Sequence, residues 1–559
     1  MTESLGRADA AYLSSLSRSR VVAVFGELVF PVGLFLVLAF GNALAHPERI
    51  NPDGICYARL AKYLAAGDLT NAISTYWSPL FAWSMAPLLL LGVDGQEAAA
   101  IAQVLWGTVL LFGFHWFLIT WTDLKPWGRS VAMLYVVLPL VTYANFVVGP
   151  DVALAATLLC YFAALGDSRW RSTTIGLFGI GMLGGITYWT KAYALPFVLL
   201  HLPMSFLLFG APPRMSRRLR DAACALLGLA IPVALWISAL TWQRGSLTIG
   251  SSGPINHAVV GPPDEIRFHP MVFGIPKAPH ISIWENPEKL PYKFWSPFES
   301  RAYFDHQLAV TRANLSRLAQ ALMDFDALGI CALLFALLLP LGWWLRDDAR
   351  TCRLLWWTAA TAALFFGGFL IVAFEPRYVN ALMLPLIVAV GLQIVLAPAR
   401  QWARWVRLLV VAIAGGSLAW TWIPQTQRGL TSNSPTYMRA LAATLPEIQF
   451  KGPFATTSWH HGIALAAYTN QASVGFPPDE SPEISAQRLR EAGVNWIVVW
   501  QMPNYPAQPV QDLYPPTIPR ALRIVQDEPG WKLQRVAILP FGSREARISF
   551  FERMNPIAP

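Results

Sequence analysis

Long uninterrupted apolar runs are the feature of this 559-residue sequence that most constrains its fold. Most of them extend for roughly 20 residues, the length that an α-helix needs to cross a hydrocarbon core of about 30 Å. Backbone polar groups inside a bilayer must be satisfied within the protein, so such runs fold as spanning helices. Because 55% of the residues are hydrophobic and only 13% are charged, the sequence predicts a polytopic α-helical membrane protein and excludes an ordinary soluble enzyme.

The apolar runs predict about eleven spanning helices, and no cleavable signal-peptide pattern accompanies the first. The predicted spans are residues 21–41, 98–120, 131–148, 151–166, 174–190, 192–210, 221–242, 327–345, 354–374, 377–397 and 405–423. A further run at 80–92 has only about a dozen residues, so we expect it to lie on the membrane surface instead of crossing.

Loop charge predicts how these helices are oriented. With the N-terminus in the cytoplasm, the cytoplasmic segments carry 17 Lys and Arg residues, whereas the short external turns carry only Lys191 and Arg377. This is the positive-inside pattern, and it would invert if 80–92 crossed the membrane. The net charge of +9 is therefore explained by topology, and nucleic acid is not an expected partner. We expect a multi-pass protein of the inner (plasma) membrane.

This orientation divides the chain into a membrane module, residues 1–424, and an extracytoplasmic soluble domain, residues 425–559. The module has two large external loops, at 42–97 and 243–326, and the second is rich in Pro and aromatic residues.

The external tail predicts a small α/β domain. Residues 494–500 (VNWIVVW) and 546–553 (ARISFFER) have the composition of strands. Residues 481–493 predict a helix, with Ser481 as its cap, Pro at its first position and Gly at its end. Strands that alternate with a helix are typical of an α/β fold.

Two acids stand at helix starts on the external side. Asp53 precedes an amphipathic pattern at 54–66 that we expect to lie along the membrane surface, and Asp151 begins another helix. Each follows a Pro, so each is a candidate N-cap. Because both lie at the outer membrane boundary, they are also candidates for an acceptor site or a metal site.

Two cations lie at the same boundary, where basic residues are otherwise scarce. Lys191 and Arg377 are either interfacial anchors that reach to lipid headgroups or partners of a lipid phosphate held there. Glu375 is close enough in sequence to neutralise Arg377. No P-loop, dinucleotide-binding glycine motif or GxSxG motif is present, so an ATP-driven pump and a serine hydrolase are unsupported.

These residues lie within stretches that resemble a known family. The stretch PDGICYARLAKYLAAGDL, with YWSPLFAWSMAPLLLLGVDGQEAAAIAQ after it, is similar to the first external loop of the GT-C glycosyltransferases. Within that superfamily it resembles the members that use polyprenyl-phosphate sugars: family 39, the protein O-mannosyltransferases and the lipid A aminoarabinose transferase. The matching positions are Asp53, Tyr57, Gly67-Asp68 and Trp77-Ser78-Pro79-Leu80.

Three later stretches extend the resemblance. GPDVALAATLLCYFAAL resembles the second external acidic turn of that family, GITYWTKAYALPFVL its TK turn and EPRYVNALMLP its RY span start. They match Asp151, Lys191, Arg377 and Tyr378. Two features depart from the pattern, because Gly54 stands where relatives often carry a second acid and the WWDYG motif of oligosaccharyltransferases is missing.

The resemblance implies an inverting glycosyltransferase, of hexosyl or pentosyl type. A polyprenyl-phosphate sugar is the implied donor, and the acceptor hydroxyl belongs to a glycan, a lipid or a protein. Asp53 is the implied general base, and Asp151 an acceptor-binding or metal residue. No cofactor is certain, and a divalent metal remains an open alternative. The implied donor-phosphate ligands are Lys191, Arg377 and Tyr378, and the implied cleft residues are Tyr57, Tyr76, Trp77 and Glu375.

Two other hypotheses stay open. A flippase or transporter for a lipid-linked sugar would use the same groove and cations without a base, although the repeats typical of transporters are not clear here. A non-enzymatic assembly or receptor protein would act through residues 425–559.

Overall fold

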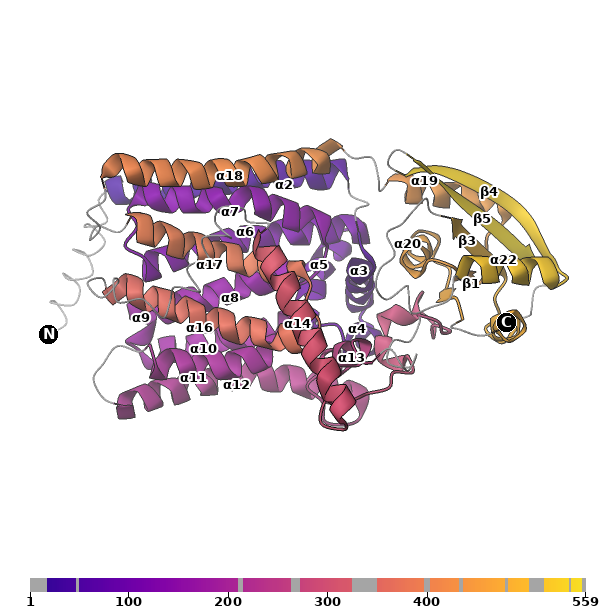
Figure 1. Cartoon of the computed structure of the whole chain (residues 1–559), viewed down its shortest axis with the longest axis horizontal. Coiled ribbons are helices and arrows are strands. Elements are labelled where there is room, and N and C mark those ends of the chain that lie inside the picture. Colours follow the sequence, from indigo (N-terminus) through magenta and orange to yellow (C-terminus); the bar gives the residue numbers. More distant parts are fainter. Residues whose placement is uncertain are drawn as a thin grey trace.

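The computed structural model is a bundle of roughly parallel helices with a small α/β domain at one end (Figure 1). It describes residues 18–46, 50–209, 215–262, 272–323, 349–396, 403–431, 436–477, 481–501, 517–541 and 544–554.

The bundle confirms the predicted fold class. Its long elements are α2 (Arg18–Ala45), α6 (Gly95–Trp121), α7 (Pro126–Phe146), α8 (Asp151–Gly166), α10 (Thr174–Thr190), α11 (Ala194–Leu207), α12 (Met215–Arg244), α16 (Ala349–Ile371), α17 (Pro376–Leu396) and α18 (Arg404–Thr431). They coincide with ten of the eleven predicted spans, and the remaining one, 327–345, lies outside the described residues. In the described part of the chain, six helices are long and apolar enough to cross a membrane.

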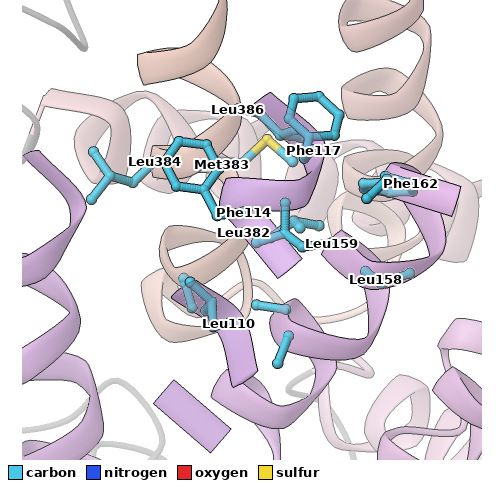
Figure 2. Close-up of a cluster of buried hydrophobic side chains, with 14 of the residues drawn as sticks. Leu110, Phe114, Phe117, Leu158, Leu159, Phe162, Leu382, Met383, Leu384 and Leu386 are labelled. Carbon is cyan, nitrogen blue, oxygen red and sulfur yellow. The ribbon is translucent and has the colours of Figure 1, made fainter. Parts of the chain in front are cut away.

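The centre of the bundle is packed by large apolar side chains. Figure 2 shows side chains of α6, α8 and α17 meeting there, and those it labels are Leu110, Phe114, Phe117, Leu158, Leu159, Phe162, Leu382, Met383, Leu384 and Leu386. Small residues bring other helices close. A Cβ at Gly181 of α10 would collide with the Ala225 carbonyl of α12, and one at Gly228 of α12 with the Phe178 carbonyl of α10. Such close backbone approach is how helices associate where no aqueous hydrophobic effect drives them.

Several short helices lie at the end of the bundle that faces the α/β domain, and the 23-residue α14 (Arg301–Met323) crosses the bundle obliquely to reach it. The short helices are α3 (Pro52–Ala65), α4 (Leu69–Ala72), α5 (Pro79–Leu90), α13 (Ser252–Val259), η2 (Ile283–Glu285) and η3 (Pro287–Lys289), while α9 (Ser168–Arg171) lies at the opposite end. The apolar run at 80–92 forms a separate 12-residue helix, α5, that packs on α3 and α6.

The helix α3 differs from the predicted surface helix at 54–66. It begins at Pro52, with Asn51 as its N-cap, so Asp53 is not a cap but lies in the first turn. Most of its residues are buried, because α5 and α6 pack on it from the bundle and α20 (Trp459–Thr469) packs on it from the external domain (Figure 1). Protein therefore covers most of this helix, and its position at the membrane surface stays a prediction.

The C-terminal domain contains a five-stranded sheet in the order β2-β1-β3-β5-β4. Strands β1, β2 and β3 are parallel, and β5 is antiparallel to both β3 and β4. The elements are α19 (Thr436–Thr444), η5 (Leu445–Ile448), β1 (Phe454–Thr456), α20, β2 (Ser473–Gly475), α21 (Pro482–Glu491), β3 (Trp496–Gln501), α22 (Thr517–Asp527), β4 (Trp531–Phe541) and β5 (Arg544–Arg553).

The secondary structure predicted for this domain is confirmed. The strands predicted at 494–500 and 546–553 correspond to β3 and β5. The predicted helix corresponds to α21, whose cap Ser481 accepts a hydrogen bond from the backbone N–H of Ile484. A boundary between residues 424 and 425 stays a prediction. The domain contacts the bundle at a second place besides the packing of α20 on α3. The Tyr468 hydroxyl donates to Gln96 Oε1 of α6 at 2.7 Å.

A buried ion pair holds three helices together inside the bundle. Arg129 of α7 donates from Nε and Nη2 to the two oxygens of Glu27 in α2, at 2.8 and 3.1 Å. The Glu27 side chain is only 4% exposed, and His115 of α6 lies 3.4 Å from it. A buried charge that loses its partner is strongly destabilising.

We expect Arg129→Ala to lower the free energy of unfolding by about 3–5 kcal/mol, because it leaves the Glu27 carboxylate without its cation. Thermal unfolding in detergent micelles measures the change. Arg301→Ala is the matched control, since the Arg301–Asp305 pair is largely exposed and should contribute no more than about 0.5 kcal/mol. Equal effects of the two substitutions would contradict the prediction.

Candidate functional site

The residues predicted to form a site lie together at the end of the bundle that faces the C-terminal domain. A cavity of about 250 Å3 opens there. Eight of the nine predicted residues line it: Asp53, Tyr57, Tyr76, Trp77, Asp151, Lys191, Arg377 and Tyr378. The ninth, Glu375, is exposed and contacts two of them. Their catalytic and binding roles stay predictions.

Helix ends bring these residues together from distant parts of the sequence. Asp53 and Asp151 lie in the first turns of α3 and α8, where a helix dipole favours negative charge. Lys191 follows the last residue of α10, where the dipole favours a cation. Arg377 is the second residue of α17, an unfavourable end for a cation, so it needs acidic partners.

Asp151 and Lys191 form the first of two ion pairs. Lys191 Nζ donates to Asp151 Oδ1 at 2.7 Å, and the Asp151 side chain is only 10% exposed. Lys191 Nζ also lies 3.5 Å from the centroid of the Tyr378 ring, within cation–π range. The carboxylate of Asp151 therefore binds a cation, and the capping role that its position suggested is wrong.

Asp53 and Arg377 form the second ion pair. Arg377 Nη2 lies 3.1 Å from Asp53 Oδ2, and Arg377 Nε lies 2.5 Å from Glu375 Oε2. The Tyr378 hydroxyl donates to the other oxygen of Glu375 at 3.3 Å. Glu375 therefore neutralises Arg377 in part and orients it, as the sequence suggested. Both predicted phosphate-binding cations are already paired with carboxylates.

Aromatic rings enclose Asp53 on the side of the first external loop. The rings of Tyr57 and Trp77 lie 5.2 Å apart, and those of Tyr76 and Trp77 lie 4.6 Å apart. Burial, together with the negative charge of Asp53, raises the pKa of Tyr57 and of Tyr76 well above its usual value. Both phenols therefore stay protonated, and Tyr76 donates its hydroxyl to Asn256 Oδ1 at 3.2 Å.

The sequence analysis missed one direct partner of Asp53. The indole Nε1 of Trp284, in η2, donates to Asp53 Oδ1 at 3.2 Å. The long loop at 243–326 also lines the cavity with residues around Gly250, Ser252 and Asn256. The sequence indicated only that this loop is rich in Pro and aromatic residues. No local pattern distinguishes Trp284 from the other aromatic residues of the loop.

The two acids do not assemble a metal site in the part of the chain that the structure describes. No group of three or more His, Cys, Asp or Glu side chains gathers there. Asp53 uses one carboxylate oxygen for Arg377 and the other for Trp284, and Asp151 Oδ1 accepts from Lys191, so these two acids alone offer too few oxygens for a divalent ion. These residues as arranged do not fit a metal ion.

Comparisons with known proteins find likeness in structure and not in sequence. No family model matches the chain, and no curated protein matches it. The structure is similar to ArnT from Cupriavidus metallidurans bound to undecaprenyl phosphate, with 13% identity and a TM-score of 0.52. That match covers 94% of this chain and 98% of ArnT.

Two other solved structures match less well. The Archaeoglobus fulgidus oligosaccharyltransferase has 10% identity and a TM-score of 0.49, over 85% of this chain and 69% of its own. The mycobacterial arabinofuranosyltransferase AftD has 14% identity and a TM-score of 0.47, over 95% of this chain and 40% of its own. ArnT is a GT-C glycosyltransferase, and its match spans nearly the whole of both chains. The chain therefore has the GT-C fold, a multi-pass helical membrane module with a small α/β domain at its C-terminal end.

Proposed function

We propose that the protein is a membrane glycosyltransferase that moves a sugar from a polyprenyl-phosphate donor to an acceptor hydroxyl on the extracytoplasmic face. The observation that carries the proposal is the cavity in which Asp53, Asp151, Lys191 and Arg377 gather at one end of the bundle. The binding of undecaprenyl phosphate by ArnT, which has the same fold, supports a polyprenyl-linked donor. The positive-inside distribution of charge supports the extracytoplasmic side.

The proposed reaction is a single displacement with inversion. The acceptor oxygen attacks the anomeric carbon, and Asp53 takes the proton from that hydroxyl. The bond between the anomeric carbon and the phosphate oxygen breaks, and the polyprenyl phosphate leaves with the electron pair. Lys191 and Arg377 stabilise the charge that develops on the departing phosphate. One carboxylate suffices, because no covalent intermediate forms.

The two ion pairs connect donor binding with the base. Arg377 donates to Asp53 Oδ2, so this oxygen is occupied while the ion pair is closed. A donor phosphate offers Arg377 a bidentate partner and offers Lys191 a point charge. As Arg377 turns toward the phosphate, its ion pair with Asp53 opens. Donor binding thereby frees the Asp53 carboxylate to accept the proton of the acceptor hydroxyl.

We expect Asp53→Asn to reduce transfer by at least about 100-fold, because it removes the general base. Binding of undecaprenyl phosphate should stay equal or become tighter, since Arg377 is released from its carboxylate. Incubation with a panel of polyprenyl-phosphate sugars, followed by mass spectrometry of the released lipid phosphate and the product, measures transfer.

Asp68→Asn is the matched control for this substitution. Asp68 lies in the same external loop, but its carboxylate only caps α4. It should keep transfer near the wild-type rate. Retained turnover by Asp53→Asn would refute the role of Asp53, and movement of labelled lipid across vesicles without any product would favour a flippase.

Lys191→Met should raise the Kd for undecaprenyl phosphate by about 10- to 100-fold, the value of one charge-assisted hydrogen bond. Asp151→Asn should lower the Kd, because it frees Lys191 from its partner. Titration of the protein in lipid nanodiscs measures both. Lys125→Met is the control, since Lys125 precedes the first residue of α7, its side chain makes no capping hydrogen bond and it does not line the cavity. Unchanged binding by Lys191→Met would show that Lys191 is not a phosphate ligand.

A further inference from the structure

Asp53 presents its two carboxylate oxygens to two different surroundings. Oδ2 faces Arg377 and belongs to the side that holds the cations. Oδ1 accepts from the indole of Trp284, whose ring lies against Trp459 of the C-terminal domain. In a displacement the incoming hydroxyl and the leaving phosphate lie on opposite sides of the anomeric carbon. An acceptor would therefore approach Asp53 from the side of Oδ1, where Trp284 lies.

Trp284 is held in place by a buried carboxylate. Glu285, which is 1% exposed, accepts from the backbone N–H of Ile281 at 2.7 Å and from the Tyr63 hydroxyl at 2.8 Å. Tyr63 belongs to α3, the helix that carries Asp53. The Trp284 carbonyl also accepts from Trp77 Nε1 at 3.2 Å. The indole is thus fixed relative to Asp53 before any substrate binds, as a binding platform requires.

A second indole continues this surface into the external domain. Trp459 is the first residue of α20, and its ring centroid lies 5.3 Å from that of Trp284. Both rings are half-buried, whereas Trp496 and Trp500 of the same domain are each only 1% exposed and form its core. Trp284 and Trp459 therefore keep part of their surface exposed, and Trp284 does so while bonded directly to Asp53.

We propose that Trp284 and Trp459 form an acceptor subsite for a saccharide. An indole face matches the apolar C–H face of a sugar ring, while the hydroxyls at the ring edge remain free for polar contacts. This inference rests on the proposed function and names its acceptor class. It assigns part of acceptor recognition to the external domain and gives the indole N–H of Trp284 a second task, the positioning of Asp53.

Saturation-transfer NMR on the full chain in nanodiscs, loaded with undecaprenyl phosphate, tests the subsite. The probes are methyl glucoside, galactoside, mannoside and arabinoside, with a seryl peptide as the alternative acceptor. The wild type should transfer saturation to at least one glycoside. Trp459→Ala should reduce that signal at least about fivefold, and Trp459→Phe should restore it. Trp242→Ala, at an exposed indole on α12, should leave the signal unchanged.

Trp284→Phe separates the two tasks of Trp284, because it keeps a ring but removes the N–H. Glycoside binding should stay within about twofold of the wild type. The kcat for transfer should fall by about 2- to 10-fold while the KM for the acceptor stays unchanged, since the Asp53 carboxylate loses the hydrogen bond that orients it. An unchanged kcat would remove the positioning role.

The outcomes of the NMR experiment separate this inference from the proposed function. Undecaprenyl phosphate that binds while every glycoside fails to bind would overturn the subsite and leave the transferase proposal intact. Trp459-dependent binding of the peptide alone would overturn the saccharide class. A wild type that does not bind undecaprenyl phosphate would overturn both proposals.

Discussion

The pairing of two carboxylates with two cations at the end of the helix bundle is the interaction on which the rest of the site depends. Asp151 binds Lys191, and Asp53 binds Arg377, with side chains that are at most 23% exposed. Charges removed from water are tolerated only when they are paired. The pairing therefore lets four ionised groups stand beside an apolar bundle, and it holds the cations ready for a negatively charged ligand.

The fold brings these groups together because the helix ends that carry them lie at the same end of the bundle. Asp53, Asp151, Lys191 and Arg377 all lie at or next to a helix terminus, so small changes in helix length or tilt would separate them. Close crossings such as that of α10 and α12, made without Cβ atoms at Gly181 and Gly228, limit those changes. Packing deep in the bundle thereby determines geometry at its end.

Most of the fold and much of the site could be predicted because they depend on local patterns. Apolar run length marks each span, and a Ser-Pro start with a Gly end marks α21. The role of Asp53 and the surroundings of α3 were not predicted, because they depend on contacts between distant parts of the sequence. Position after a Pro suggested that Asp53 caps its helix, yet its carboxylate binds Trp284 and Arg377, which lie 231 and 324 residues away. The amphipathic pattern of α3 suggested a lipid surface, yet α20 of the external domain covers it.

Gly54 shows why a departure from the family pattern is compatible with the same chemistry. A Cβ at this position would lie 2.8 Å from Ile50 Cγ1 and 2.9 Å from Val148 Cγ1, closer than such atoms can pack. A second acid after Asp53 would therefore have to displace these side chains, because α3 packs directly against the segment that leads to Asp151. The same close contact brings the first turn of α3 next to the start of α8. The two acids of the cavity, Asp53 and Asp151, accordingly come from two different helices.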